Sequence, residues 1–223
     1  MPNEMTAIST VDAVVLSILE GELKVLLHCR PVQPYEGSWA LPGGFIRVDE
    51  DADAESAIRR ILKDKAGVTG LYLEQLATYS GPDRDPRGWS ISIAHLALVP
   101  GAKLAIDEGK AALVSIDDLP KLPFDHGKII KDAVARLRGK GAYSTLPASF
   151  LGKNFTLTEM QSAYETALGT RVDSSSFRRK VLSLGILTDT GRSRQGDNRR
   201  PAKVYRLTKA VGTFDRTLGH SAG

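Results

Sequence analysis

The sequence of 223 residues has little cysteine and no long apolar stretch, and each shortage excludes a class of protein. Cys29 is the only cysteine, so the chain forms no internal disulfide, and no group of histidines and cysteines has the spacing of a zinc site. No apolar run approaches the roughly 20 residues that a membrane-spanning helix needs. The opening "MPNEMTAIST" contains an acidic residue and no apolar core, so we expect no signal peptide, no membrane anchor and a cytoplasmic location.

Charge is divided unevenly along the chain, although the formal net charge is only +4. From Leu151 onward there are 13 Lys and Arg against 6 Asp and Glu, a net charge of +7, whereas the first 150 residues carry −3. The length also exceeds that of one ordinary domain. These features predict an acidic domain over residues 1–142 and a basic domain over 143–223, with the boundary near "GKGAYSTLPASF".

Apolar runs and polar turns alternate in the first 142 residues. "TVDAVVLSIL" (10–19) and "LKVLLHC" (23–29) predict a hairpin joined by "EGE", and "WALPGGFIRV" (39–48) predicts a strand broken by a glycine turn. "DADAESAIRRILKDKAG" (51–67) has apolar residues at near-helical spacing and predicts a helix that stops at Gly67.

Two more strands and a second helix follow. "GLYLEQLATYS" (70–80) and "WSISIAHLALV" (89–99) predict strands on either side of the polar loop "GPDRDPRG". Residues 111–141 then predict a short strand, a loop punctuated by prolines and a helix that starts at His126 and ends near Arg138. The first domain is therefore expected to belong to the α+β class.

The basic part of the chain predicts two helices followed by two strands. Thr156 and Glu159 fit a capping box ahead of a helix that ends at Gly169, and Asp173 caps a second helix that ends at Gly185. The first helix has an apolar stripe of Met160, Ala163, Tyr164, Ala167 and Leu168, and the second has a core face of Phe177, Val181, Leu182 and Leu184. "ILTDTGRSRQGDNRRPAKVYRLT" then predicts two strands around a basic loop. This order is that of a winged helix-turn-helix domain.

Gly44 and Glu50 fit the opening of a signature known from pyrophosphate-cleaving enzymes, and Gly67 and Val68 fit its close. The signature runs Gly, five residues, Glu, seven residues and then Arg-Glu-apolar-x-Glu-Glu-x-Gly-apolar. Its glutamates share one helix face, where they can hold Mg²⁺. "WALPGGF" before it and "YLEQLATYSGPDRDPRG" after it complete the likeness. The N-terminal half resembles the Nudix hydrolases, and in particular their ADP-ribose pyrophosphatase branch.

Most metal-binding acids of that signature are missing. Counted back from Gly67, its glutamate positions hold Ile61, Asp64 and Lys65, and in an alignment shifted by one residue they hold Arg60, Lys63 and Asp64. The stretch between Glu50 and Arg60 is also two residues longer than in the signature. A hard dication would meet one Asp between two Lys, so we predict no catalytic residue, no bound metal and no required cofactor. The segment also fits a solvated amphipathic helix unrelated to any site.

Binding of a nucleoside diphosphate can persist where cleavage is lost. The Gly43–Gly44 turn lets backbone N–H groups approach a phosphate. Trp39 and Tyr79 can stack on a nucleobase, although both also fit the core. The cations available to neutralise a diphosphate are Arg30, Arg47, Arg84 and Arg87, and Arg87 could equally join Asp83 in pinning the "GPDRDPRG" turn.

Two histidines and the cysteine have simpler interpretations. His28 and His95 lie inside predicted apolar strands, so we expect core histidines rather than catalytic bases. Cys29 follows the apolar run "LKVLL", which indicates a buried structural thiol rather than a reactive one.

The second predicted helix of the basic domain offers residues for base and phosphate contacts with DNA. Its first turn, which usually meets base edges, holds three serines, and three cations follow them. The basic loop adds further cations around its tip, as expected of a wing that follows the DNA backbone. The predicted DNA-binding residues are Ser174, Ser175, Ser176, Arg178, Arg179, Lys180, Arg192, Arg194, Arg199, Arg200 and Lys203. A solvated basic surface is the alternative.

Together, the two halves are similar to the Nudix-related transcriptional regulators (NrtR-like). "LPFDHGKIIKDAVARLRGK", "FTLTEMQSAYETALG", "FRRKVLSLGIL" and "RRPAKVYRLT" extend the likeness over almost the whole chain. The resemblance implies a Nudix fold, with a mixed sheet between helices, that binds an effector such as ADP-ribose. It also implies a winged helix that binds operator DNA in a homodimer, often at genes of NAD metabolism. By the resemblance, effector binding falls to Arg30, Trp39, Gly43, Gly44, Phe45, Arg47, Asp83 and Arg87.

The expected function is thus a DNA-binding repressor controlled by a nucleotide effector. One alternative is an active ADP-ribose pyrophosphatase with an unusual metal site of Glu50, Asp64 and Glu55. Another is a nucleic-acid adaptor in which the Nudix half serves only as a dimerisation scaffold.

Overall fold

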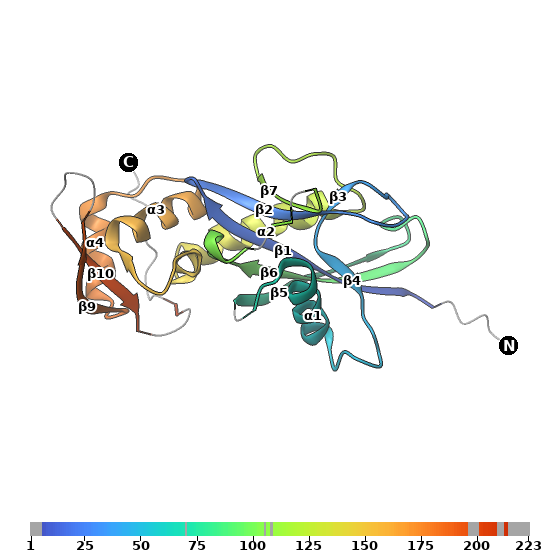
Figure 1. Cartoon of the computed structure of the whole chain (residues 1–223), viewed down its shortest axis with the longest axis horizontal. Helices are drawn as coiled ribbons and strands as arrows, with labels where there is room; N and C mark the ends of the chain where they lie inside the picture. Colours follow the sequence, from blue (N-terminus) through green and yellow to red (C-terminus); the bar gives the residue numbers. More distant parts are fainter. Residues whose placement is uncertain are drawn as a thin grey trace. The chain divides into compact units, whose positions relative to one another are not determined.

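The computed structural model divides the chain into two compact units (Figure 1). The N-terminal unit consists of residues 1–17 and 24–134, and the C-terminal unit consists of 18–23 and 135–223. The residues described are 6–69, 71–104, 106–107, 109–195, 201–208 and 212–213. No helix within these ranges combines the length and apolar character needed to cross a membrane. The predicted domain boundary after residue 142 stays a prediction.

A mixed seven-stranded sheet forms the N-terminal unit. Its strands are β1 (Ile8–Leu19), β2 (Glu22–Cys29), β3 (Trp39–Ala40), β4 (Gly43–Phe45), β5 (Tyr72–Gly81), β6 (Ser90–Leu98) and β7 (Ala111–Ser115). The order is β3-β2-β1-β6-β5, with β4 paired to β1 and β7 paired to β2. β1 runs parallel to β6 and antiparallel to β4. A short 3-10 helix, η1 (Gly101–Lys103), follows β6.

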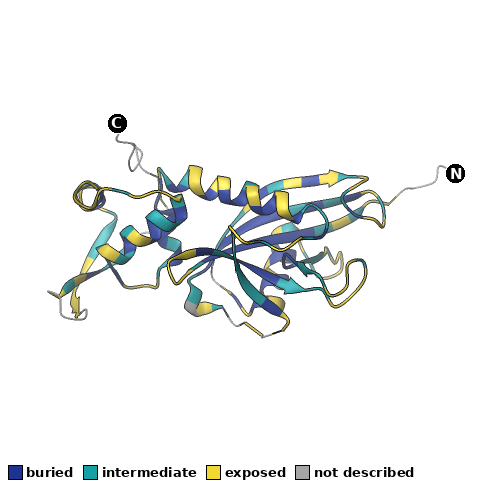
Figure 2. Ribbon diagram, turned by 90° about the horizontal axis from the view of Figure 1, so that it is seen from above, coloured by how far each residue is buried: buried dark blue, intermediate teal, exposed yellow. Residues whose placement is uncertain are grey.

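Helices α1 (Ala54–Ala66) and α2 (His126–Gly141) cover opposite faces of this sheet (Figure 1). Ile58 of α1 packs in one apolar cluster with Val11 of β1. On the other face, the Tyr79 hydroxyl donates to Asp132 of α2 over 2.8 Å. The central strands are therefore buried on both faces (Figure 2).

Local signals set the ends of α1. Asp53 caps the first turn by accepting from the Ser56 backbone N–H, and the Ser56 hydroxyl accepts from the Asp53 N–H in return. Gly67 adopts the left-handed conformation, with φ 63°, that a helix C-terminus favours. The predicted helix end at Gly67 is confirmed.

Two details of the predicted elements were wrong. Gly43 and Gly44 form no turn but lie within β4. The interruption between strands β3 and β4 lies instead at Leu41 and Pro42. The predicted end of α2 near Arg138 was early, since the helix continues to Gly141. The predicted start of α2 at His126 is confirmed.

The C-terminal unit contains two helices and a small sheet. In chain order its elements are η2 (Leu146–Phe150), β8 (Phe155–Thr156), α3 (Leu157–Leu168), α4 (Ser174–Ser183), β9 (Leu187–Arg194) and β10 (Ala202–Leu207). The strands pair antiparallel in the order β8-β10-β9. This is the predicted helix-turn-helix with a β wing, and the predicted α+β class is confirmed for the chain.

The core of this unit joins the two helices. The rings of Tyr164 and Phe177 meet edge to face at 5.3 Å, and the buried Tyr164 hydroxyl donates to the Ser144 carbonyl oxygen. Val181 is buried beside them, but Leu182 is 51% exposed, so its predicted core position was wrong. Leu182 follows Val181 by one residue, which turns its side chain about 100° away on an α-helix.

Candidate functional sites

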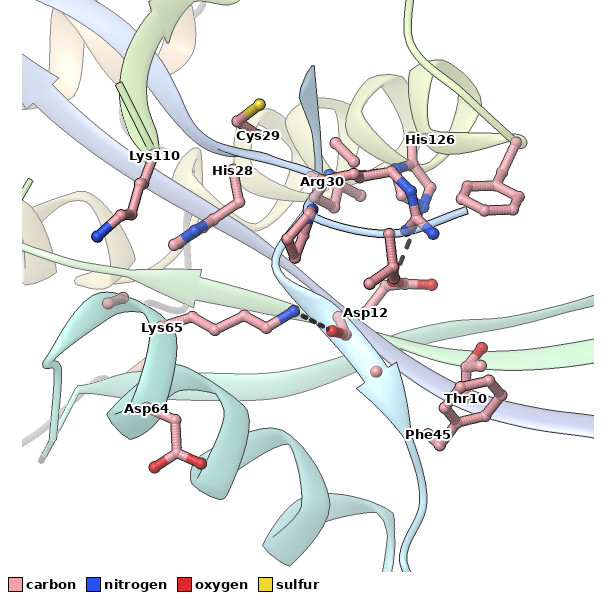
Figure 3. A pocket seen from close by; sticks show the side chains of 18 of the residues that line it. Thr10, Asp12, His28, Cys29, Arg30, Phe45, Asp64, Lys65, Lys110 and His126 are labelled. Carbon is pink, nitrogen blue, oxygen red and sulfur yellow. Dashed lines mark hydrogen bonds and ion pairs between the residues drawn. The ribbon is translucent and has the colours of Figure 1, made fainter. Parts of the chain in front are cut away.

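A cavity of about 880 Å³ opens in the N-terminal unit (Figure 3). Its wall is formed by β1, β2, β4, the last turn of α1, the loops around residues 84–87 and 124–126, and Asp107, Gly109 and Lys110. The volume falls in the range of roughly 300–1,000 Å³ that small-molecule sites have. Six Lys or Arg and four Asp line the cavity, so its chemistry suits an anionic or highly polar ligand.

Asp12 places a buried carboxylate beneath this cavity. It lies in the apolar strand β1 and is only 6% exposed. The Ser92 hydroxyl of the neighbouring β6 donates to it, and the nearest nitrogens of Arg84 and His126 lie 3.9 and 3.7 Å from its oxygens. A buried charge without partners costs several kcal/mol, so these neighbours keep the carboxylate in place.

Gly43 is required by the position of Asp12. A Cβ atom on Gly43 would lie 1.9 Å from Asp12 Oδ1 and 2.9 Å from the Val11 carbonyl oxygen. Both distances are far below van der Waals contact, so a side chain fits only if β4 moves away from β1. Glycine thus permits β4 to form the floor of the cavity against β1.

The two arginines of the 81–88 loop are held by carboxylates. Arg84 donates twice to Asp125, over 2.9 and 3.1 Å, and its side chain is 8% exposed. Arg87 donates from its backbone N–H and its guanidinium to the buried Asp85. The carboxylate that pins this turn is therefore Asp85, whereas the contact proposed for Asp83 is not among those the structure describes.

Arg30, Lys65 and Arg87 form a cation cluster at the cavity. Burial lowers the pKa of Arg30, and the nearby Arg87 lowers it further. Lys65 is exposed in the structure, but desolvation by the surrounding atoms and then the charge of Arg30 lower its pKa. Both shifts include repulsion between neighbouring positive charges. A polyanion bound among them would relieve that repulsion.

Further contacts hold the cation cluster to the cavity wall. Lys65 Nζ donates to the Gly43 carbonyl oxygen over 2.7 Å. Arg30 Nε donates to the Pro34 carbonyl oxygen over 2.8 Å, and its guanidinium lies 4.9 Å from the Phe124 ring centre. The Arg87 guanidinium lies 5.2 Å from the Phe45 ring. These positions are fixed without a ligand, which lowers the cost of binding one.

Two histidines of the cavity are neutral. Burial lowers the pKa of His126, which accepts from the Leu41 backbone N–H at Nδ1, so its proton lies on Nε2 facing Asp12. Burial also lowers the pKa of His28, whose buried Nε2 has no hydrogen-bond partner among the described residues. His28 was expected in the core but lines the cavity, whereas His95 is buried as expected.

Cys29 also lines the cavity. It is only partly buried, and its Sγ lies 3.6 Å from the Gly37 carbonyl oxygen. The predicted buried thiol was therefore wrong, because the apolar run "LKVLL" ends before β2 reaches the cavity rim.

The signature segment of α1 and the loop before it hold no free set of acids. Arg60 binds Asp51 through two hydrogen bonds of 2.8 and 2.6 Å, and Arg47 pairs with Glu50 at 2.8 Å. Ile61 packs against Gly44. No group of three His, Cys, Asp or Glu side chains that could hold a metal occurs in the described part of the chain.

The cavity brings together five of the nine residues predicted to bind a ligand, namely Arg30, Gly43, Gly44, Phe45 and Arg87. Trp39 lies on β3, Tyr79 packs towards α2, Arg47 pairs with Glu50 and Asp83 is exposed, and none of these four is in its lining. The ligand role of each of the nine stays a prediction.

Among the lining residues that were not singled out from the sequence, Asp12, Lys65 and Asp85 matter most to the contacts described above. The sequence gives one indication that Asp12 has a special role, since it is an acidic residue inside an apolar strand. Lys65 was noted only as the loss of a glutamate, and Asp85 was indistinguishable from its neighbour Asp83. Their importance depends on contacts between distant segments.

The predicted DNA-binding residues lie along α4 and the wing. Asp173 caps α4 by accepting from the Ser176 backbone N–H. The first-turn residues 174–176 are exposed, and the Ser174 hydroxyl donates to Gln161 over 2.7 Å. Arg178 and Arg179 are exposed one turn later and Lys180 is half-buried. Arg192 is exposed on β9, while Arg199 and Arg200 lie outside the described residues.

Three of these cations line one groove of about 620 Å³ in the C-terminal unit. Arg178 donates to the Thr158 hydroxyl over 3.3 Å, Arg194 pairs with Glu159, and Lys203 pairs with Asp189 at 3.0 Å. Exposed pairs of this kind contribute only about 0–1 kcal/mol, so they can exchange for phosphate contacts at little cost.

Replacing Gly43 by alanine tests the contact between β4 and Asp12. We expect Gly43→Ala to destabilise the protein by about 1–3 kcal/mol, because the new methyl group overlaps the Asp12 carboxylate. Gly127→Ala in α2 is the matched control, since a Cβ atom there meets no atom within 4 Å. Thermal unfolding measures both, and equal melting temperatures for the two variants would contradict the expectation.

Asp51 should make stability depend on acid pH. Hydrogen bonds from Arg60 hold the pKa of Asp51 at about 2, below the value of about 3.9 expected in an unfolded chain. The ionised carboxylate therefore stabilises the fold above about pH 4, and that contribution is lost as the pH falls towards 2. Asp51→Asn should lower the melting temperature at pH 7, with the difference from wild type shrinking below pH 4. Asp49→Asn, at an exposed neighbouring position, should have no such profile.

Comparison with known proteins identifies both units. The chain matches models of the NUDIX domain over residues 9–134 and of the NrtR DNA-binding winged helix domain over 147–207. It is 36% identical over 203 residues to the ADPR responsive transcriptional repressor NtrR of Acinetobacter baylyi, covering 89% of this chain and 81% of the relative. It is also 44% identical over 117 residues to an ADP-ribose pyrophosphatase of Methanocaldococcus jannaschii, covering 52% and 68%.

A solved relative has a similar fold. Shewanella oneidensis NrtR complexed with a 27mer DNA superimposes with a TM-score of 0.87 at 36% identity, covering 94% of this chain and 99% of that one. The NUDIX domain of the same protein, complexed with ADP ribose, matches 60% of this chain and 90% of its own length with a TM-score of 0.56. The chain therefore belongs to the NrtR family of transcriptional regulators, in which a NUDIX domain precedes a DNA-binding winged helix.

Proposed function

We propose that this protein is a transcriptional repressor that binds operator DNA through its winged helix and senses ADP-ribose, or a closely related nucleotide, in its NUDIX cavity. The main support for the effector is the cation cluster of Arg30, Lys65 and Arg87, because three neighbouring positive charges in the lining of one cavity are suited to a diphosphate. Regulation of genes of NAD metabolism remains part of the proposal.

ADP-ribose matches the chemical character of the cavity. Its diphosphate would lie against the cation cluster. Its ribose hydroxyls would find an acceptor in Asp12, in the cavity lining. Phe45 and Phe124 offer apolar faces for the sugar or base. The related Shewanella NUDIX domain complexed with ADP ribose supports this assignment.

The DNA half rests on α4 and the wing. In this proposal the exposed serines at the start of α4 would meet base edges, and Arg178, Arg179 and the wing cations would meet phosphates. The Shewanella relative complexed with a 27mer DNA supports duplex DNA as the partner. We further propose a homodimer, in which two recognition helices would read a roughly palindromic operator with half-sites spaced by multiples of about 10 base pairs.

The effector and the operator are coupled in this proposal. A metabolite that changes DNA affinity by about 5 to 150-fold corresponds to a coupling of about 1–3 kcal/mol. Thermodynamic linkage then requires DNA to change the affinity for the metabolite by the same factor.

The proposal excludes efficient hydrolysis of the effector. In the alternative hypothesis of an active pyrophosphatase, Glu50, Glu55 and Asp64 would bind the metal. Two of these carboxylates already form ion pairs, Glu50 with Arg47 and Glu55 with Arg59. Of the three helical glutamate positions of the signature, only that of Asp64 holds a carboxylate, which is too few for a hard dication. The likeness to the Methanocaldococcus pyrophosphatase is the observation that favours the enzyme, and a direct assay decides between the two.

Gel shifts test DNA binding. The wild-type protein should shift a duplex from its own upstream region selectively, and the affinity should fall with salt. Arg179→Ala should weaken binding about equally for all duplex sequences and reduce the salt slope by about 1, because a phosphate contact is lost. Arg59→Ala, which removes an exposed arginine of α1, should leave DNA binding unchanged.

ADP-ribose added to the wild-type complex should alter the shift. If Arg179→Ala and Arg59→Ala changed the affinity for DNA equally, the assignment of α4 as the recognition helix would be contradicted. A DNA-binding scaffold without an effector would shift the duplex but would not respond to ADP-ribose.

Turnover of ADP-ribose should be absent in the presence of Mg²⁺ or Mn²⁺, while calorimetry still detects binding. The reason is the lack of a carboxylate set that could place a metal and activate water. Robust product formation that Asp64→Ala abolishes would contradict this expectation and favour the enzyme.

A further inference from the structure

Lys65 lies where the Nudix signature has a metal-binding glutamate. The left-handed cap at Gly67 ends α1 where the glycine of the signature is expected, so counting back from it places Lys65 at the last glutamate position. Its Nζ donates to the Gly43 carbonyl oxygen over 2.7 Å, from the last turn of α1 to β4 (Figure 3). A positive charge thus occupies the side of the cavity where the signature places acids.

The residues present do not fit a divalent cation. The other two glutamate positions hold Ile61, which packs against Gly44, and Asp64. Nearby acids are engaged, since Asp51 is bound by Arg60 and Glu50 by Arg47. Magnesium needs oxygen ligands in octahedral geometry, and an ammonium 2.7 Å from the nearest backbone carbonyl oxygen would repel it.

We propose that the Lys65 ammonium replaces the divalent cation of the Nudix site and contacts the diphosphate of the effector directly. This proposal rests on the function proposed above. The ammonium carries three donors and uses one on Gly43, which leaves two to donate to phosphate oxygens. The carbonyl holds the flexible side chain in position, so less side-chain entropy is lost when the ligand binds.

Its neighbours support a shared anion site. Arg30 is close enough to lower the pKa of Lys65, and Arg87 in turn lowers that of Arg30. The three cations come from α1, the end of β2 and the 81–88 loop, and all line the same cavity. Two negative charges of a diphosphate would therefore meet three fixed positive charges without any metal.

The replacement also separates binding from cleavage. A lysine can neutralise a phosphate, but it carries no bound water that a metal would activate for attack. The site therefore recognises a diphosphate and leaves it intact.

Calorimetry with ADP-ribose tests the proposal on the full-length protein. The affinity of the wild type should be the same in EDTA and in millimolar Mg²⁺. Lys65→Met should reduce affinity at least tenfold in both buffers, and Lys65→Glu should reduce it further, because a carboxylate repels the diphosphate. Lys131→Met, which removes an exposed lysine of α2 outside the cavity, should bind as the wild type does.

Two results would overturn the proposal. One is a wild-type affinity that falls when EDTA replaces Mg²⁺, and the other is wild-type affinity in Lys65→Met. Melting temperatures of all variants establish that each is folded. If the wild type binds no ADP-ribose in either buffer, the proposed effector function itself fails, and this outcome is distinguishable from a failure of Lys65 alone.

Discussion

The packing of the Asp12 carboxylate against the backbone of β4 is the constraint on which the N-terminal unit depends. The carboxylate is buried in a strand that is otherwise apolar, so donors and cations must surround it, and Ser92, Arg84 and His126 do so from three different segments. Its proximity requires glycine at residue 43. Gly43 in turn presents the carbonyl oxygen that holds Lys65. One buried negative charge thus orders the floor of the cavity and, indirectly, the cations at its mouth.

Most of the fold could be predicted because its signals are local. Each helix cap joins residues within one helical turn, and the capping residues are Asp53, Gly67, Thr156, Gly169 and Asp173. The strands were predicted from runs of apolar residues bounded by turn residues. The misplaced features depended on packing. Leu182 is exposed because α3 and the wing cover only one face of α4, and the two glycines lie in a strand because β1 supplies a partner for them.

The site was less predictable, because its contacts join distant parts of the sequence. Asp12 and Ser92 are 80 positions apart, and Lys65 reaches back 22 positions to Gly43. A motif comparison could register that glutamates were absent, but it could not indicate that the lysine at the last of their positions contacts the backbone of β4. Asp83 and Asp85 are equally plausible partners for Arg87 in sequence, and the backbone of the 81–88 loop selects Asp85.

The bond between Lys65 and Gly43 has a consequence for how a sensor of this kind behaves in a cell. A cation built into the polypeptide is present at every copy of the site, at a fixed effective concentration, and it cannot be removed by competition. Magnesium in a cell is shared among nucleotides, nucleic acids and enzymes. A sensor that needed bound magnesium would therefore respond both to the concentration of the metabolite and to that of free magnesium. With a lysine ammonium in place of the metal, the occupancy of the site depends on the concentration of the metabolite and not on that of magnesium.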